Sequence, residues 1–280
     1  MILDQVDRTI EEALEEDLPR GDVTSESLIP PESRSRAVFL AKEAGVLAGL
    51  EVARRVFEII DPQTRFRRIF RDGQAFKRGD ILAEVRGRSI SLLKAERTAL
   101  NFLQRMSGIA TKTRRFVDAV AGTRTKILDT RKTTPTLRRL EKYAVKVGGG
   151  ENHRFSLSDM VLIKDNHLRL VGSITEAVQR AKEKARPGMA IEVEVTDFGQ
   201  AREAVAAGAT MIMLDNMPFR KLRPVVRWLK GKVPVEVSGK VSLAQARRIA
   251  GLGVDFISVG GLTHSFSSVD ISLEFLDKRA

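Results

Sequence analysis

From about residue 125 onward, short apolar stretches alternate along the chain with longer amphipathic segments. The short stretches are rich in β-branched residues and methionine, as buried strands are, and lie at 126–130, 160–164, 191–195, 210–215, 234–238 and 255–259. The segments between them begin with helix start signals, such as Ser173 with Glu176 and Ser242 with Gln245. Strands that alternate with helices are joined by crossovers and run parallel. This part is therefore predicted to form an open α/β sheet or an α/β barrel.

Residues 1–108 follow a different pattern, which predicts a separate α+β domain. Helices are expected over 4–17 and 50–60, and short strands are separated by turns at Asp72-Gly73 and Gly79-Asp80. A long helix from about Ser91 would link this domain to the repeating part, which is predicted to occupy residues 109–268.

The last part of the chain alternates in polarity. Val269, Ile271 and Leu273 are separated by single polar residues, which indicates a half-buried strand. We expect the segment 269–280 to return to the first domain.

The period of two in the strands brings polar side chains together. Residues i and i+2 face the same side, so Glu192 and Glu194 share one face while the apolar residues of that strand share the other. If the apolar faces meet the helices, the polar faces converge inside the barrel. The residues expected at its C-terminal rim, where α/β enzymes place their sites, are Arg131, Lys164, Glu194, Asp215 and Ser238. Burying a charge costs free energy unless the charge is paired or takes part in function. This set therefore predicts either a structural ion-pair network or an active site.

Glycine-containing turns follow the last two predicted strands, at 238–240 and 259–261. In α/β barrels, the loops after late strands often offer backbone N–H groups to a phosphate. These turns therefore favour a phosphorylated ligand.

Composition then excludes several classes of protein. A chain of 280 residues with 42% hydrophobic residues can bury a core. The lack of cysteine excludes disulfides, thiolate nucleophiles and Cys-ligated zinc, and three histidines leave little for a His-based metal site. The acidic N-terminus does not match a signal peptide, and no apolar stretch approaches the roughly 20 residues that span a bilayer. We expect a soluble, cytoplasmic protein without a membrane partner.

The net charge of +12 leaves three interpretations open: nucleic-acid binding, solvated surfaces, or a pocket for a small anionic substrate. Aromatic residues make up only 5% of the chain, so stacking platforms for single strands are scarce. The cations are scattered through runs such as 65–71 and 112–115 rather than gathered in a tail. We expect most of them to be solvated, and no nucleic-acid partner.

Several motifs together resemble a known family. They are "AERTALNFLQRMSGIAT" (95–111), "DTRKTTP" (129–135), "GGGENHR" (148–154), "LIKDNH" (162–167), "EVEV" (192–195), "MLDNM" (213–217), "EVSG" (236–239) and "SVGGLTHS" (258–265). In this order they are similar to quinolinate phosphoribosyltransferase, the carboxylating nicotinate-nucleotide pyrophosphorylase. The similarity spans essentially the whole chain.

The resemblance implies a reaction in NAD biosynthesis. Quinolinate and phosphoribosyl pyrophosphate would give nicotinate mononucleotide, pyrophosphate and carbon dioxide, with Mg2+ as cofactor. It also implies an N-terminal α/β sandwich, an open α/β barrel of six or seven parallel strands, and a homodimer in which one subunit's N-terminal domain closes the other's barrel.

The resemblance further implies roles for single residues. Arg97 would reach into the partner's site, and the quinolinate carboxylates would be held by Arg131, His153, Arg154 and Lys164. Lys132 would face the pyrophosphate, and Glu194 and Asp215 would contact the ribose hydroxyls and magnesium. The 5′-phosphate would meet Ser238, Gly239, Lys240, Val259, Gly260 and Gly261, and Thr130 completes the substrate-binding set. The predicted catalytic residues are Lys132, Lys164, Glu194 and Asp215. Glu192 and Glu236 are expected to anchor the arginines and lysines.

Two positions depart from the family pattern. The family often has Gly or Asn where Lys240 stands and Ala where Gly261 stands, which leaves the phosphate contacts there open. Two other functions also stay open. One is a phosphoribosyltransferase of the same fold that takes nicotinate or another acid, although the excess of cations argues against an acid with one carboxylate. The other is nucleic-acid binding.

Overall fold

The structure is a computed structural model that describes residues 4–276. Residues 1–3 of the predicted N-terminal domain and residues 277–280 of the predicted C-terminal segment lie outside the described residues. The chain divides into two compact units. The first contains residues 4–114, 134–149 and 266–276, and the second contains residues 115–133 and 150–265. No helix in the described part of the chain is both long and apolar enough to cross a membrane.

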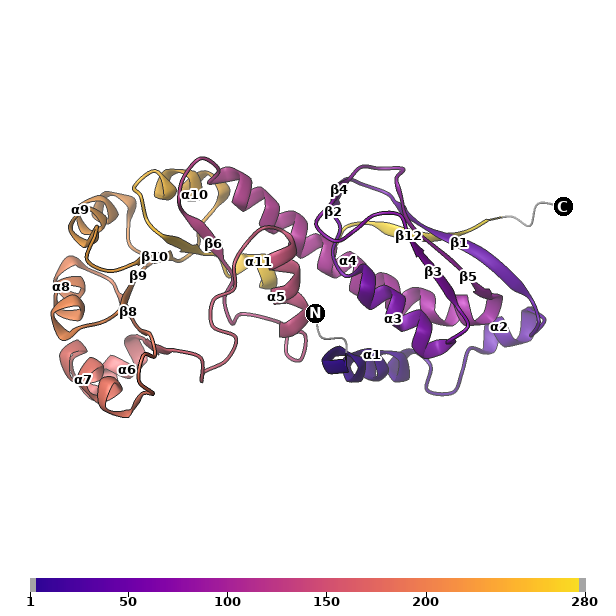
Figure 1. Cartoon of the computed structure of the whole chain (residues 1–280), viewed down its shortest axis with the longest axis horizontal. Helices are drawn as coiled ribbons and strands as arrows, with labels where there is room; N and C mark the ends of the chain where they lie inside the picture. Colours follow the sequence, from indigo (N-terminus) through magenta and orange to yellow (C-terminus); the bar gives the residue numbers. More distant parts are fainter. Residues whose placement is uncertain (1–3, 277–280) are drawn as a thin grey trace. The chain divides into compact units, whose positions relative to one another are not determined.

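The first unit is built on an antiparallel sheet (Figure 1). Its strand order is β12 (Ile271–Phe275), β1 (Arg34–Ala41), β5 (Ile81–Arg88) and β3 (Arg65–Arg68). A separate short pair joins β2 (Gly45–Val46) and β4 (Ala75–Phe76). The helices are α1 (Asp4–Asp17), α2 (Val23–Leu28), α3 (Leu50–Ile60), most of α4 (Ser89–Ala119), and α5 (Arg138–Val147).

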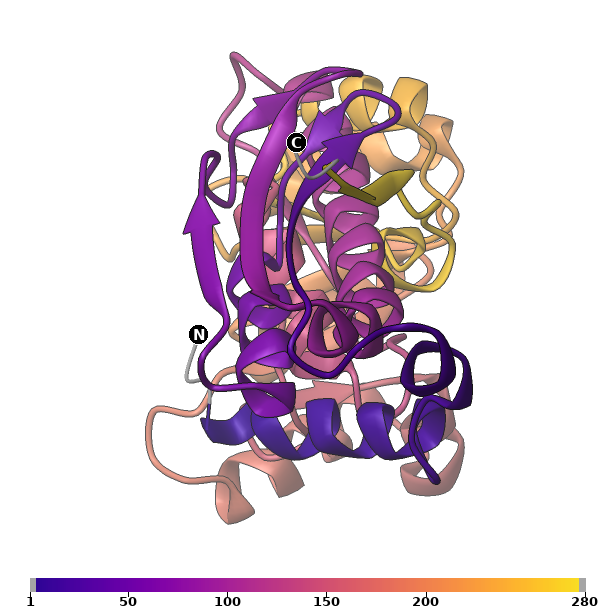
Figure 2. The same cartoon turned by 90° about the vertical axis from the view of Figure 1, so that its right-hand side faces the viewer.

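The two faces of this sheet differ sharply in polarity. Ala37 and Phe39 of β1 face the helices and are fully buried, and the ring of Phe39 meets Phe57 of α3 edge-on at 6.0 Å. The strands are strongly twisted, as Figure 2 shows for the purple strands. On the opposite face, Arg86 lies directly across from Arg36 on one side and Arg65 on the other. One apolar face under helices is what the predicted α/β sandwich requires.

The segment 134–149 groups with the first unit, whereas the strand pattern placed it within residues 109–268. Its helix α5 carries Glu141, which is fully buried and accepts hydrogen bonds from Arg105 of α4 and from the Thr134 N–H. The Tyr143 hydroxyl donates to Asp72 at 2.8 Å. Polar contacts with partners distant in the sequence therefore place this segment, and such contacts leave no periodic signal.

The second unit is a parallel sheet of six strands among the residues described. Their order is β6 (Lys126–Leu128), β11 (Phe256–Ser258), β10 (Val235–Ser238), β9 (Met211–Asp215), β8 (Ile191–Val195) and β7 (Val161–Ile163). β6 and β7 form its two edges, so the barrel is open, as the resemblance implied.

Helices follow the strands of this sheet. They are α6 (Asp165–Val171), α7 (Ile174–Lys184), α8 (Phe198–Ala207), α9 (Phe219–Leu229), α10 (Leu243–Ala250) and α11 (Gly261–His264). Figure 1 shows α7, α8, α9 and α10 along the outer side of the sheet. The predicted caps are present, because the Ser173 and Ser242 side chains accept hydrogen bonds from the backbone N–H groups of Glu176 and Gln245.

The predicted alternation of faces is confirmed in this sheet. Val193 and Ile212 are neighbours in register and are fully buried on the helix side. Glu194 and Glu236 flank Met213 in register on the other side of the sheet. The inner face is therefore lined with charged and polar groups in the upper half of the barrel.

Candidate active site

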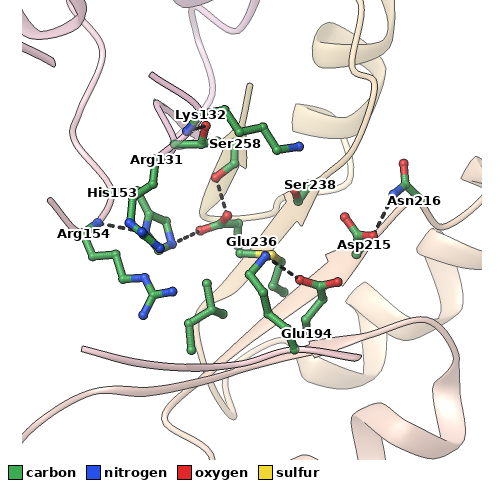
Figure 3. Close-up of a pocket in the computed structure, with 14 residues that line it drawn as sticks. Arg131, Lys132, His153, Arg154, Glu194, Asp215, Asn216, Glu236, Ser238 and Ser258 are labelled. Atoms are coloured by element: carbon green, nitrogen blue, oxygen red, sulfur yellow. Dashed lines mark hydrogen bonds and ion pairs between the residues drawn. The ribbon is translucent and has the colours of Figure 1, made fainter. Parts of the chain in front are cut away.

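A cavity of about 390 Å³ opens at the carboxyl ends of the parallel strands (Figure 3). Most of the residues predicted for the site line it, namely Thr130, Arg131, Lys132, His153, Arg154, Lys164, Glu194, Asp215 and Ser238. The other lining residues are Leu162, Met213, Asn216, Glu236 and Ser258. Of these, Met213 lies two residues before the predicted site residue Asp215, so the period of two also places it on the inner face. Leu162 precedes the lining residue Lys164 by the same interval.

The remaining predicted residues do not line this cavity. Gly239 and Lys240 directly follow Ser238, and the turn 259–261 directly follows Ser258. Arg97 is exposed on α4, in the first unit.

Four cationic side chains lie along one side of the cavity. Arg131 and Lys132 follow β6, Arg154 lies in the loop before β7, and Lys164 follows β7. Burial, and then the positive charge of Arg131, lower the pKa of Arg154. The two guanidinium groups are thus close enough to repel each other. A ligand with two carboxylates would relieve this repulsion, because each planar guanidinium matches one carboxylate.

Two carboxylates stand on the other side. Lys164 Nζ lies 3.0 Å from Glu194 Oε2, and Asn216 Nδ2 donates to Asp215 Oδ2 at 2.7 Å. Each of these contacts uses one oxygen of the carboxylate. Because Mg2+ prefers carboxylate oxygens and takes only one or two of them beside substrate phosphates, Glu194 and Asp215 fit the role of magnesium ligands.

The backbone of Lys132 is fixed from two directions. The Thr130 hydroxyl accepts a hydrogen bond from the Lys132 N–H at 3.0 Å, and the buried Thr263 hydroxyl of α11 donates to the Lys132 carbonyl at 2.8 Å. These contacts connect the loop after β6 with the turn after β11. They hold Lys132 at the rim of the cavity.

Two glycines permit close approach next to the cavity. Gly239 has φ +142°, and a Cβ there would lie 2.7 Å from Asn216 Oδ1. A Cβ on Gly260 would lie 3.1 Å from the Lys132 side chain. Side chains at these positions would therefore displace residues that line the cavity.

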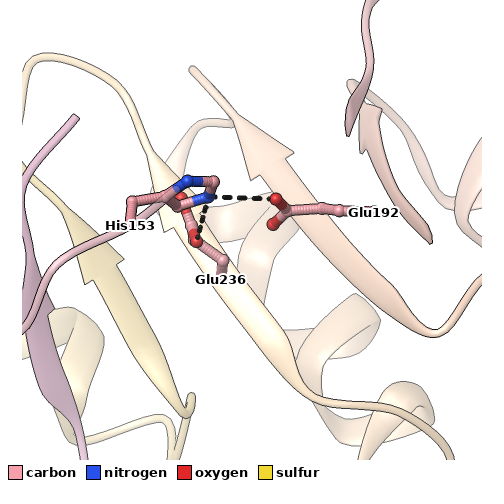
Figure 4. A group of neighbouring side chains, drawn as sticks. All are labelled: His153, Glu192 and Glu236. Carbon is pink, nitrogen blue, oxygen red and sulfur yellow. Dashed lines mark hydrogen bonds and ion pairs between the residues drawn. The ribbon is translucent and has the colours of Figure 1, made fainter. Parts of the chain in front are cut away.

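A largely buried cluster adjoins the cavity, and two of its members, His153 and Glu236, also line it (Figure 4). His153 Nε2 is 3.1 Å from Glu192 Oε2 and 3.4 Å from Glu236 Oε2. The Ser258 hydroxyl donates to the other oxygen of Glu236. Glu192 and Glu236 are fully buried. Their direct partner is thus His153. Against the lowering by burial, the charge of Glu192 also acts to raise the pKa of Arg154, one of the arginines that the glutamates were expected to anchor.

The pKa of His153 and the geometry around its ring point to different protonation states. Burial lowers the pKa of His153, but hydrogen bonds and charges from Glu192 and Glu236 outweigh it and raise that pKa to about 9. Burial raises the pKa of Glu192 to about 7. However, the Arg154 N–H donates a hydrogen bond to His153 Nδ1 at 2.8 Å, which argues against a doubly protonated ring. We follow the geometry, because a proton on Nδ1 would point at the proton of the Arg154 N–H across that distance. The geometry therefore favours a ring with one proton, on Nε2.

A pocket of cations and carboxylates at the carboxyl ends of parallel strands defines an α/β-barrel enzyme that acts on small anions. The chain matches the family described as quinolinate phosphoribosyl transferase, with the N-terminal domain over residues 22–107 and the C-terminal domain over residues 109–274. The chain belongs to this family.

Related proteins and structures match this chain over most of its length. The chain is 43% identical over 259 residues to a probable nicotinate-nucleotide pyrophosphorylase [carboxylating] of Bacillus subtilis, covering 92% of this chain and 89% of that protein. It is 43% identical over 272 residues to the nicotinate-nucleotide pyrophosphorylase [carboxylating] of Mycobacterium leprae, covering 95% of each chain. The crystal structure of NadC from Streptococcus pyogenes is similar with a TM-score of 0.95 at 43% identity, covering 99% of each chain.

Proposed function

We propose that this chain is a quinolinate phosphoribosyltransferase, which converts quinolinate and phosphoribosyl pyrophosphate to nicotinate mononucleotide, pyrophosphate and carbon dioxide. The observation that carries the proposal is the cavity itself, where Arg131, Arg154 and Lys164 face Glu194 and Asp215. Quinolinate brings two adjacent carboxylates and phosphoribosyl pyrophosphate brings several phosphate charges. A pocket of this charge pattern both steers and orients such substrates.

Binding uses the cations in two groups. Arg131, Arg154 and Lys164 hold the quinolinate carboxylates and turn the pyridine nitrogen toward the ribose. Lys132, held in place through its backbone, faces the pyrophosphate. The turns at 238–240 and 259–261 bind the 5′-phosphate, and Gly239 and Gly260 keep side chains there from displacing Asn216 and Lys132.

The reaction needs no nucleophilic side chain. The pyridine nitrogen forms a bond to the anomeric carbon as the bond from that carbon to pyrophosphate breaks, and the bonding electrons leave with pyrophosphate. Positive charge develops on the ribose, and Glu194 and Asp215 stabilise it. The bond to the 2-carboxylate then breaks, carbon dioxide leaves, and the cationic ring stabilises the electrons until a proton from solvent replaces the carboxylate.

Glu194 and Asp215 are the residues that would hold magnesium. When bound, the ion supplies positive charge to the pyrophosphate and ribose oxygens. The two carboxylates also contact the ribose hydroxyls.

We also infer a homodimer in which Arg97 of one protomer completes the site of its partner. The inference is supported by the exposure of Arg97 on α4, outside the unit that contains the cavity. Two-fold symmetry would then supply each site with one more cation. We place the enzyme in the cytoplasm, because its highly charged substrates do not cross a bilayer unaided.

The test is an assay for nicotinate mononucleotide by liquid chromatography and mass spectrometry, with quinolinate, phosphoribosyl pyrophosphate and magnesium. We expect turnover with quinolinate and little with nicotinate, which lacks the second carboxylate. Equal turnover of both acids would instead support the other phosphoribosyltransferase. No product from either, combined with DNA binding that falls steeply with salt, would support nucleic-acid binding.

A further inference from the structure

We propose that Glu192 and Glu236 are positioning residues for the quinolinate half of the site, and that they act through the ring of His153 on the backbone of Arg154. The inference rests on the proposed function and adds to it. It also replaces direct substrate contact by His153, which the family resemblance implied, with a role inside the protein.

The ring of His153 has both nitrogens engaged within the protein. Nδ1 accepts the Arg154 N–H at 2.8 Å, and Nε2 faces Glu192 and Glu236 at 3.1 and 3.4 Å. An imidazole has only these two polar atoms. The ring can therefore bind a carboxylate of the substrate only by giving up one of these contacts.

The contact at Nδ1 also excludes a metal ion from the cluster. His153, Glu192 and Glu236 stand close enough to be metal ligands. However, a ring that accepts a hydrogen bond on Nδ1 must carry its proton on Nε2, and a protonated nitrogen cannot coordinate a metal. The cluster is thus centred on the hydrogen bond from Nε2–H to Glu192, with Glu236 Oε2 3.4 Å from the same nitrogen.

The loop that carries Arg154 is tied to several strands through this ring. Glu192 comes from β8, and Glu236 from β10 receives a further hydrogen bond from Ser258 of β11. The His153 N–H donates to Asp129 Oδ1, directly after β6, at 2.9 Å. Residues of three strands, and Asp129 directly after a fourth, therefore surround the residue that precedes Arg154.

The position of Arg154 depends on these ties. Its backbone N–H is bonded to the ring, and its guanidinium reaches into the cavity, with Nη1 donating to the Met160 carbonyl at 3.1 Å. A displacement of about 1 Å in a group that orients substrate can cost about a hundredfold in rate. Removing a contact that holds the His153 ring should thus weaken quinolinate binding and leave phosphoribosyl pyrophosphate binding nearly unchanged.

Glu192 gives the sharper test, because it is fully buried and does not line the cavity. We expect Glu192→Ala to raise KM for quinolinate by about ten- to a hundredfold and to change KM for phosphoribosyl pyrophosphate by less than about threefold. Glu192→Gln should recover most of the loss, since an amide oxygen can still accept the Nε2–H. If His153 instead bound substrate as a cation, the charge of Glu192 would matter and Gln would fail as Ala does. The matched control is Glu183→Ala, an exposed residue of α7.

A second measurement needs no turnover. Long-range proton–nitrogen NMR at pH 7 should show one unprotonated and one protonated nitrogen in His153, and only three histidines contribute signals. The signals are assigned by their loss in His153→Gln. Two protonated nitrogens, an unchanged KM for quinolinate in folded Glu192→Ala, or a metal bound stoichiometrically at the cluster would overturn the proposal. If the parent protein does not turn over quinolinate, the proposed function fails, but the NMR measurement still tests the ring.

Discussion

Arg131 and Arg154 are two like charges that interact within the cavity. The charge of Arg131, after burial, contributes to lowering the pKa of Arg154, and a bound dianion would offset this repulsion. The pair is thus adapted to a ligand with adjacent carboxylates. Arginine rather than lysine suits this task, because its fork can bind one carboxylate through two hydrogen bonds.

We predict that Arg131→Ala or Arg154→Ala weakens quinolinate binding by about 2 to 5 kcal/mol, the usual cost of removing one partner from a buried charge pair. Calorimetric titration of quinolinate measures this directly. Arg202→Ala, at an exposed position of α8, is the matched control. Unchanged affinity in both variants would rule out the two arginines as carboxylate ligands.

Glu194 and Asp215 provide a second test among single residues. Glu194→Gln and Asp215→Asn keep the side-chain volume but remove the charge that faces the ribose. We expect kcat to fall by about a hundredfold or more, the range for removing one preorganised electrostatic contact. The midpoint of thermal unfolding should change little. A variant that turns over at the parent rate in saturating magnesium would show its residue to be structural.

Much of the site could be predicted from the sequence, because the period of two fixes which residues of a strand share a face. That period pointed Glu194, Asp215 and Ser238 to one rim. It could not give distances between strands that are far apart in the sequence. For this reason Glu192 and Glu236 were predicted on the inner face, but their three-way contact with His153 was not predicted.

Among the elements, the antiparallel sheet shows how the surplus of arginine is accommodated. Arg36, Arg86 and Arg65 lie side by side across three strands, which is unfavourable for like charges. Glu84, buried within the same face, accepts hydrogen bonds from both Arg36 and Arg86. The rest of the run at 65–68 is mostly exposed, as expected for solvated charge.

The hydrogen bond from Arg36, opposed by burial and aided by Arg86, lowers the pKa of Glu84 below its ordinary value of 4.5. A carboxyl whose pKa is lower in the folded state stabilises the fold above pH 4.5 and loses this effect as the pH falls through the folded pKa. We predict that Glu84→Gln costs about 1 kcal/mol at pH 7, at the lower end for charge-assisted bonds because both arginines are about half exposed.

Calorimetric unfolding of parent and Glu84→Gln proteins between pH 3 and 7 measures the effect. A loss of about 2 to 4 °C in Tm is expected at pH 7, and the difference should shrink below pH 4.5. Glu183→Gln should show no such trend. A difference in Tm that stays constant over this range would mean that lost packing, rather than lost charge, destabilises the variant.

At the scale of the whole molecule, the sequence predicted the parallel unit best. Each strand after residue 125 carries its own signal, and crossovers leave few alternatives for its order. The segment 134–149 was harder to assign, because Glu141 and Tyr143 bind to residues of the first unit through isolated polar contacts. Such contacts depend on the folded positions of both partners.

Assembly gives the test at this scale. We predict that Arg97→Ala and Lys164→Ala are each nearly inactive, and that mixing them restores activity. One site of each mixed dimer would then have both cations. With random exchange half of the dimers are mixed, so about a quarter of the parent activity is the ceiling. If mass spectrometry confirms exchange and activity does not return, Arg97 does not complete the partner's site.

The return of β12 to the first sheet also affects how the chain is made. Lys42, directly after β1, and Glu274 in β12 form an ion pair across 232 positions of sequence. During translation the edge of β1 therefore stays without its neighbour until residues 271–275 have left the ribosome. A product cut after residue 265 would keep that edge open to strands of other chains. Light scattering should show such a truncated product aggregating under conditions in which the parent protein does not.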